Sequence, residues 1–121
     1  MTKKTEMLSH EKVRLTEGFW KEKRELTRDV TLMSIYDRFT ETGRFASLDF
    51  NHPDPLIFWD SDIAKWIEGA AYLLEDKRDE KTEKLVDEAV AKIKLHQRPD
   101  GYFNIHFDTK EPAARFSRYT D

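Results

Sequence analysis

The sequence predicts an all-α protein with about three helices and one extended segment near its C-terminal end. Three observations support this fold class. Apolar residues recur at helical spacing in three runs, over residues 19–42, 61–74 and 82–97. A short charged turn joins the last two runs, which is typical of an antiparallel αα-hairpin. Strand-like alternation of apolar and polar residues is confined to residues 102–107.

Residues 1–17 are predicted to be a polar lead-in, and the first helix follows over residues 19–42. In this helix Leu26, Val30 and Met33 recur at helical spacing, and we expect them to face inward. A neighbouring apolar stripe is formed by Leu32, Tyr36 and Phe39. Gly43 is placed to end the helix in a left-handed conformation.

Residues 44–57 contain two prolines in close succession, so this segment is predicted to be a connecting loop. We expect Phe45, Leu48 and Phe50 to hold the loop against a core.

The second helix, residues 61–74, is predicted to be mostly buried, because its apolar arc is wide. Ile63, Ile67, Ala70 and Leu74 form the main stripe, and Trp66 and Leu73 widen it. Ser61, Lys65, Glu68, Tyr72 and Glu75 form the opposite face. The third helix, residues 82–97, places Val86, Ala89, Val90 and Ile93 inward.

The segment after the third helix changes pattern. Pro99 ends the helix, and Asp100 with Gly101 predicts a tight turn. Residues 102–107 then alternate, which predicts an extended segment with one apolar face. The apolar set is Phe103, Ile105 and Phe107, and the polar set is Tyr102, Asn104 and His106.

Composition excludes several classes of function. The chain of 121 residues has 21 basic and 24 acidic residues with interleaved signs, so neither nucleic acid nor an acidic membrane surface is an expected partner. There is no cysteine, which excludes disulfides, thiolate nucleophiles and thiolate-bound zinc in this chain. No apolar run approaches the about 20 residues of a membrane span. The N-terminus is charged and lacks an apolar signal core, so a cytoplasmic location is expected.

The stretch FWDSDIAKW, residues 58–66, is the candidate for chemistry, because paired carboxylates beside aromatic rings are typical of sugar-cleaving sites. Asp60 is instead predicted to be the N-cap of the second helix, with Asp62 in its first turn. Residues two positions apart on an α-helix are separated by about 200° of rotation, so the two carboxylates do not face each other. Asp62 could still lie at the edge of a pocket.

Three further residues are candidates for a substrate pocket. Trp59 could stack on a sugar ring or fill the core, whereas Trp66 is assigned to the core because of its helical spacing with isoleucines. His106 and Tyr102 share the polar side of the extended segment, where they could line a pocket or face solvent. No pair of histidines has the spacing of metal ligands on one helix.

Four blocks of the sequence resemble the N-terminal part of the catalytic domain of glycoside hydrolase family 127, the β-L-arabinofuranosidase family. These blocks are GFWKEKRELTRD, LIFWDSDIAKWIEGAAYLLE, HQRPDGYFNIHF and EPAARFSRYTD, and the resemblance runs from Leu15 onward. The F-x-D-S-D-x-x-K-W block and the Q-x-x-D-G-Y turn occur in the same order as in the family.

The resemblance implies that residues 18–121 are a fragment of an (α/α)6 barrel, a ring of six helical hairpins. It also implies a retaining hydrolase with a cysteine nucleophile on zinc and a glutamate acid/base, all downstream of the matched part. No catalytic or zinc-binding residue is therefore carried over, and no cofactor is expected in this chain. What carries over is a structural motif: Asp60, Ser61, Asp62, Lys65, Trp66, Asp100, Gly101 and Tyr102.

Three hypotheses follow for function. The chain could be a truncated or partial arabinofuranosidase-like hydrolase, inactive in isolation, whose full-length relatives act on a carbohydrate substrate. It could instead be a non-catalytic helical module that binds a sugar or a protein. It could also self-associate, or assemble with a chain that supplies the missing helices, because apolar faces of a partial barrel would otherwise stay wet.

Overall fold

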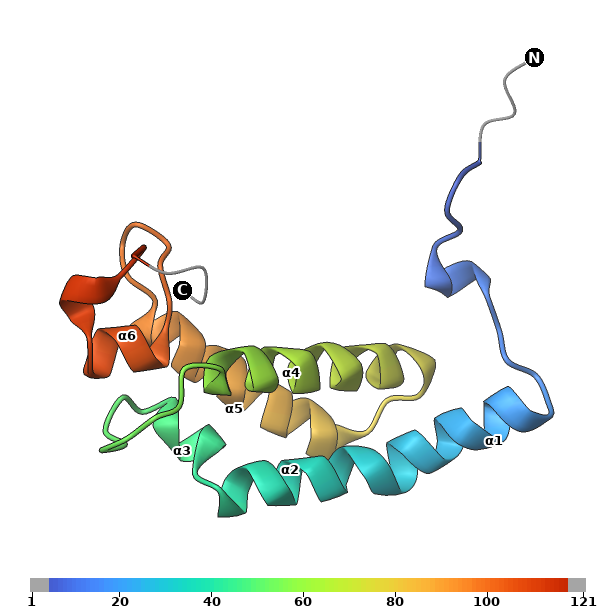
Figure 1. The fold of residues 1–121 in the computed structure, drawn as a ribbon. Coiled ribbons are helices and arrows are strands. Elements are labelled where there is room, and N and C mark those ends of the chain that lie inside the picture. Colours follow the sequence, from blue (N-terminus) through green and yellow to red (C-terminus); the bar gives the residue numbers. More distant parts are fainter. Residues whose placement is uncertain (1–4, 118–121) are drawn as a thin grey trace.

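The computed structural model describes residues 5–117, and over this range it contains helices and no β-strand (Figure 1). This confirms the predicted all-α class. The first four residues of the predicted lead-in and the last four of the predicted fragment lie outside the described residues. The helical elements are η1 (His10–Lys12), α1 (Phe19–Leu26), η2 (Thr27–Thr31), α2 (Leu32–Glu41), α3 (Arg44–Ser47), α4 (Trp59–Asp76), α5 (Glu80–His96), α6 (Ile105–Thr109) and η3 (Pro112–Ala114).

The predicted first helix is one continuous run formed by α1, η2 and α2, and η2 is a turn of π-helix. The stripe of Leu26, Val30 and Met33 was expected to face inward. This is wrong for Leu26 and Val30, whose side chains are about half exposed. The neighbouring stripe makes the contacts instead: Leu32 is buried, and Tyr36 and Phe39 pack beside it. Val30 and Leu32 are two residues apart and therefore lie on nearly opposite sides of the helix, so the packing of Leu32 leaves Val30 exposed.

The end of this long helix agrees with the prediction. Thr42 is the C-cap, and Gly43 follows with φ 82° and ψ 6°, the left-handed conformation that glycine adopts without strain. The loop after it is pinned as expected, because Leu48 is buried and Phe45 and Phe50 pack against the core. The loop also contains the short helix α3, which the proline pattern did not predict.

Helices α4 and α5 form the predicted antiparallel hairpin. α4 extends past both ends of the predicted range 61–74, whereas α5 begins before the predicted residue 82 and ends at His96, one residue before the predicted end. The start of α5 is fixed by Asp79, whose carboxylate accepts a hydrogen bond from the backbone N–H of Thr82 at 2.8 Å. In Figure 1, α5 lies behind α4, and the α1–α2 helix runs along the side of the pair.

Two groups of buried residues hold these elements together. The first joins α2, α4 and α5 around Leu32, Trp66, Ala70 and Leu73. Trp66 is in the core as predicted, and its indole N–H donates to the carbonyl of Leu32 at 3.0 Å. The second group joins the end of α3 to α4, α5 and α6, through Leu48, Ile63, Ala89 and Ile105.

The extended segment predicted for residues 102–107 is wrong from Ile105 onward, where α6 begins. Asn104 has an extended backbone and acts as the N-cap of α6, because its side chain accepts a hydrogen bond from the N–H of Phe107 at 2.9 Å. Ile105 and Phe107 are both buried, so the alternation identified buried residues correctly although the backbone is helical.

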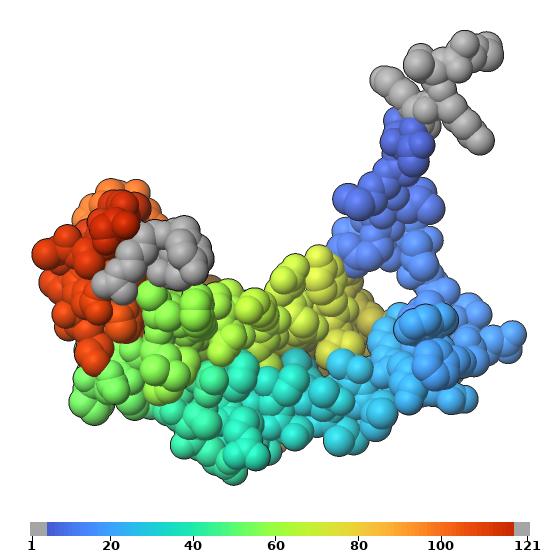
Figure 2. Space-filling view, in the orientation of Figure 1, coloured from blue at the N-terminus to red at the C-terminus, as the bar shows by residue number. Residues whose placement is uncertain are grey.

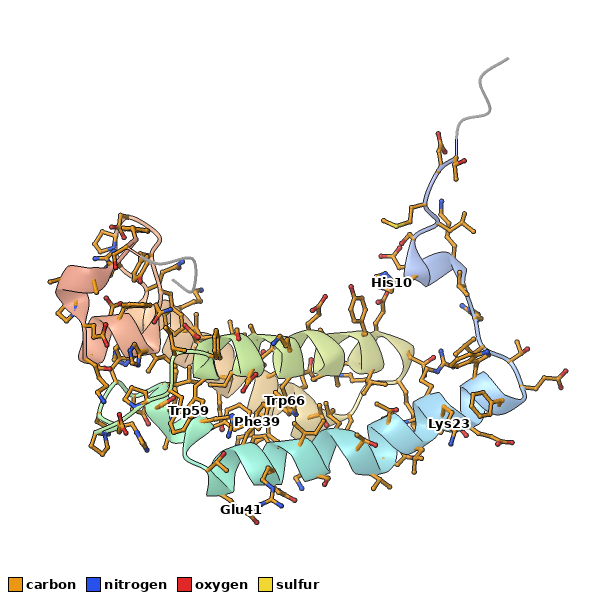
Figure 3. All side chains as sticks on the ribbon, in the orientation of Figure 1. His10, Lys23, Phe39, Glu41, Trp59 and Trp66 are labelled. Atoms are coloured by element: carbon orange, nitrogen blue, oxygen red, sulfur yellow. The ribbon has the colours of Figure 1, made fainter. Side chains whose placement is uncertain are left out.

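Residues 5–17 extend away from the helices as an arm (Figures 1 and 3). The arm touches the helical body at two points. His10 contacts Glu75 and packs edge-on against the ring of Tyr72, and Arg24 donates to the carbonyl of Leu15 at 3.2 Å. Among residues 5–117, no helix is long and apolar enough to cross a membrane.

Candidate functional site

The candidate site begins at the N-terminus of α4, where the FWDSDIAKW stretch enters the helix. Phe58, and not Asp60, occupies the N-cap position, so the predicted capping role of Asp60 is wrong. The helix starts earlier than expected because the N–H of Trp59 is already bonded to the carbonyl of Leu56 at 3.2 Å. Asp60 and Asp62 therefore both lie in the first turn, where negative charge suits the helix dipole. The hydroxyl of Ser61 donates to the carbonyl of Phe58 at 3.0 Å.

Asp60 points toward the start of α6. Burial raises the pKa of its carboxyl group, against the opposing effect of backbone hydrogen bonds from Ser61 and Ile105. The bond from Ser61 measures 2.9 Å. Ile105 is the first residue of α6, so this carboxylate connects the first turns of two helices. A raised carboxyl pKa is a common mark of a general acid, but here the partners of Asp60 are backbone groups of the fold itself.

Asp62 points in another direction and is held by two cations. Arg44 donates from Nε to Asp62 Oδ2 at 3.1 Å, and Lys65 Nζ lies 3.8 Å from Oδ1. The guanidinium of Arg44 also lies over the rings of Phe39 and Trp59, at 4.9 and 5.5 Å from their centroids. Asp60 and Asp62 thus have separate partners, which agrees with the helical argument that they are not a facing pair.

Trp59 is part of the buried core. Its side chain is 7% exposed and packs edge-on against His52, with ring centroids 4.9 Å apart. Its indole Nε1 is buried and has no hydrogen-bond partner among the described residues. Figure 3 shows Trp59, Phe39 and Trp66 gathered where α2 and α4 face each other. A ring placed in this way has no face open for stacking on a sugar.

His106 and Tyr102 lie apart from this cluster. The ring nitrogen Nδ1 of His106 is 2.7 Å from the carbonyl of Pro55, and because a carbonyl only accepts, Nδ1 is the donor. Its Nε2 lies 3.5 Å from Glu111. The ring of Tyr102 lies beneath the guanidinium of Arg115 at 3.8 Å. His106 therefore ties α6 to the 52–58 loop and does not share a pocket with Asp62.

The predicted turn at Asp100 and Gly101 is present. Gly101 has φ 88°, a conformation in which a side chain would be strained, and its N–H donates to the carbonyl of Arg98 at 2.8 Å. Asp100 accepts a hydrogen bond from the N–H of Tyr102 at 3.0 Å, and this bond lowers the pKa of its carboxyl group. The D-G-Y block thus forms a turn that directs the chain from α5 to α6.

Sequence reasoning missed an apolar groove between the α1–α2 helix and α4, with a volume of about 470 Å³. These two elements are cyan and green on the face shown in Figure 2. Lys65 and Tyr72 had been placed on the polar face of the helix, so no stripe pointed to the groove. A glycine within an otherwise apolar helix, Gly69, was the available signal. The lining residues are Arg24, Thr27, Thr31, Leu32, Ile35, Phe39, Asp62, Lys65, Trp66, Gly69, Tyr72 and Leu73.

The side chains that could bind a metal ion are scattered over the described part of the chain. Over residues 5–117, no group of three or more histidine, cysteine, aspartate or glutamate side chains is arranged to hold a metal ion, and the sequence contains no cysteine. The zinc site implied by the family resemblance therefore has no matching ligands in the described part of the chain.

The chain is a helical-hairpin domain, because its αα-hairpin packs along a third, long helix. The sequence profile of the β-L-arabinofuranosidase catalytic domain of glycoside hydrolase family 127 matches residues 12–120, and the chain belongs to this family.

Two solved structures are similar to the chain. One is Ara127N, a GH127 β-L-arabinofuranosidase from Geobacillus stearothermophilus T6, with 31% identity and a TM-score of 0.77 over 85% of this chain and 18% of that chain. The other is BT3674, a GH127 β-arabinofuranosidase, with 28% identity and a TM-score of 0.73 over 84% of this chain and 17% of that chain. The chain thus spans less than one fifth of the length of these relatives. No curated protein sequence matches it.

Proposed function

We propose that this chain supplies the first helical wall of an arabinofuranoside-cleaving domain, and that the 121-residue chain alone does not hydrolyse glycosides. The observation that carries the proposal is that residues 12–120 match a catalytic domain while the chain spans only 18% of the Geobacillus enzyme. The names of both solved relatives support arabinofuranosides as the substrate class of the whole domain.

The chemistry of glycoside hydrolysis supports the second half of the proposal. Such enzymes need two carboxyl groups that flank one bond, about 5–9.5 Å apart, one to protonate the leaving oxygen and one to attack or to activate water. In this chain Asp62 is neutralised by Arg44 and Lys65, and Asp60 is turned toward the backbone of Ile105. Among residues 5–117, neither carboxylate is arranged with a partner acid across an open cleft.

The two carboxylates of the FWDSD stretch have a structural role in this proposal. Asp60 joins α4 to α6, and the Arg44–Asp62 ion pair joins α3 to α4. His106 adds a third link, from α6 to the carbonyl of Pro55. Together these polar contacts fix the end of the hairpin where the loops meet, and this would hold the wall in place for residues supplied by the rest of the domain.

The isolated chain is the first test. The purified protein is incubated with p-nitrophenyl β-L-arabinofuranoside, with and without added zinc, and the expected rate equals that of buffer. Turnover that co-purifies with the chain and follows its concentration would overturn the claim of inactivity.

A chimera is the second test. The part of the Geobacillus enzyme that this chain matches, 18% of its length, is replaced by residues 12–120, and arabinofuranosidase activity is expected to survive. A chimera carrying Trp66→Asp is expected to lose activity, because the charge would be buried in the wall, whereas Leu95→Ala, at an exposed position, is the control. A folded chimera without activity would contradict the proposed role.

A second candidate function is a binding module for a sugar or a protein, and the apolar groove beside α4 favours it. Calorimetric titration of the chain with L-arabinose and short arabinosides separates the two functions. Saturable binding that is lost on filling the groove would support the module.

A further inference from the structure

The arm and α1 lie against the helical body without joining its core, and α1 projects past the end of α4 (Figure 1). Over residues 5–117, neither group of buried residues includes a residue of the arm, α1 or η2. The apolar side chains of α1, Phe19, Trp20 and Leu26, are all about half exposed or more. Segments with few buried apolar contacts open most easily, so this part of the chain is held less firmly than the hairpin.

Polar contacts at the end of α4 hold this part in place. Arg24 Nη1 lies 3.1 Å from Asp76 Oδ1, and His10 contacts Glu75 through Nε2. The ring of His10 also lies edge-on to that of Tyr72, with centroids 4.8 Å apart. The four side chains of the two polar pairs are each at least one quarter exposed, so these contacts are weak and are screened by salt.

The long helix has a built-in hinge at η2, between α1 and the body. A π turn interrupts the regular ladder of backbone hydrogen bonds, and sharp helix bends occur at such turns. Thr27, the first residue of η2, donates from its hydroxyl to the carbonyl of Lys23 at 2.8 Å, a type of bond that often bends helices. Arg28 lies 3.5 Å from Asp76, so Asp76 keeps a cation when Arg24 leaves. This second cation makes the release of Arg24 less costly.

The groove beside α4 is bounded at one end by this part of the chain. Arg24 and Thr27 line that end on the side of α1 and η2, and Tyr72 and Leu73 line it on α4. The rest of the groove lies between α2 and α4, which the first core group holds together. A rotation of α1 about η2 therefore changes the width of one end of the groove and leaves the other end fixed.

We propose that the arm and α1, residues 5–26, form a lid that is hinged at η2 and latched to the end of α4 by Arg24 and His10. Release of the latch swings the lid away from α4 and opens the end of the groove between Arg24 and Tyr72. The lid does not depend on the proposed enzymatic role, because it uses only contacts within this chain.

Paired spin labels measure the position of the lid, and the absence of cysteine from the sequence makes the labelling specific. One pair is placed at Glu22→Cys on the lid and Ala91→Cys on α5, both exposed positions. Double electron–electron resonance gives the distribution of distances between the labels. One distance should dominate at low salt, and about 0.5 M NaCl should raise the population of a longer distance at least about twofold. The pair Asp37→Cys and Ala91→Cys, both on the body, is the control and should not change.

Matched substitutions test the latch. Arg24→Gln removes the ion pair with Asp76 and should raise the population of the longer distance about threefold at low salt. His10→Ala removes the contact with α4 and should raise the same population about twofold. Lys21→Gln makes the same change of charge on the lid, but Lys21 pairs with Glu25 within α1, so the population should stay unchanged.

Hydrogen exchange over residues 19–26 separates a swinging lid from an unravelling helix. Slow exchange that persists while the longer distance grows supports the lid, whereas exchange that becomes fast in parallel would overturn the proposal. A distance that ignores both salt and Arg24→Gln, or that responds equally to Lys21→Gln, would also overturn it. If Arg24→Gln does not fold, the salt dependence of the labelled chain without that substitution decides.

Discussion

Replacing Ile63 by alanine tests whether the second core group stabilises this chain. Ile63 is 0% exposed and lies where α4 meets Leu48, Ala89 and Ile105. The change removes three buried carbons, which costs about 2.4 kcal/mol at about 0.8 kcal/mol each. A cavity that does not collapse adds to this, so we expect a total loss of about 3 kcal/mol in the free energy of unfolding.

Urea unfolding followed by circular dichroism measures this loss. Small domains have slopes of about 1–3 kcal/mol per molar urea, so the midpoint should fall by about 1–3 M. Leu95→Ala is the matched control, because it also removes three carbons, but from a residue that is 77% exposed. Its effect on the free energy of unfolding should stay within about 0.5 kcal/mol. Equal losses in the two variants would refute the reasoning. An unfolding curve without a cooperative transition in the unmodified chain would refute the premise that this core is stable by itself.

Three further substitutions have defined outcomes in the same urea assay. Gly69→Ala should stabilise the chain by about 1 kcal/mol, because alanine favours the helix and the new methyl group meets no neighbour; a loss of stability would show that the space is filled. Trp66→Phe should cost about 1–2 kcal/mol, because it removes the indole bond to Leu32; an unchanged midpoint would contradict that bond. Asp60→Asn tests pH dependence. The folded pKa of Asp60 is raised, so its contribution to stability is full below about pH 3.8 and is lost as the pH rises through the folded pKa. The asparagine variant should therefore gain stability relative to the unmodified chain above that pH, and parallel profiles of the two proteins would contradict the raised pKa.

The helices could be predicted from the local spacing of apolar residues, and there is a physical reason for this. The pattern around Trp66, Ala70 and Leu73 is strong because a buried helix must present one continuous apolar face. Gly43 was identified as a helix end because few other residues tolerate its left-handed backbone. Both features depend on a few adjacent residues, which is the range over which sequence alone is informative.

The errors arose where contacts from distant residues decide the outcome. Asn104 bonds to the N–H of Phe107, and this cap starts a helix in a segment whose alternation is that of a strand. Asp60 looked like a cap, yet its carboxylate contacts Ile105, which is 45 positions away in the chain. The groove over Gly69 depends on how α2 lies against α4, and no local pattern specifies that.

In the candidate site, too, local geometry could be predicted from the sequence and contacts between distant residues could not. Helical geometry alone separated Asp60 from Asp62, and the structure agrees. The roles of Arg44 and His106 could not be anticipated, because each pairs with a residue from another element, Asp62 or Pro55. The sequence does not decide between a stacking role and a core role for Trp59, and its burial against His52 places it in the core.

The π turn at Thr27–Thr31 has a consequence for how this helix can change in length. Such a turn holds one residue more than a regular α-helix needs, so a single-residue deletion there would restore an unbroken α-helix rather than break it. Five residues of a π turn rotate the chain about as far as four residues of an α-helix, so the part before the turn would keep nearly its present orientation relative to α2. Arg24 would still reach Asp76 on α4, which it contacts at 3.1 Å, and would still hold the arm through the carbonyl of Leu15. The π turn therefore absorbs one residue of length without changing the direction in which the N-terminal arm leaves the domain.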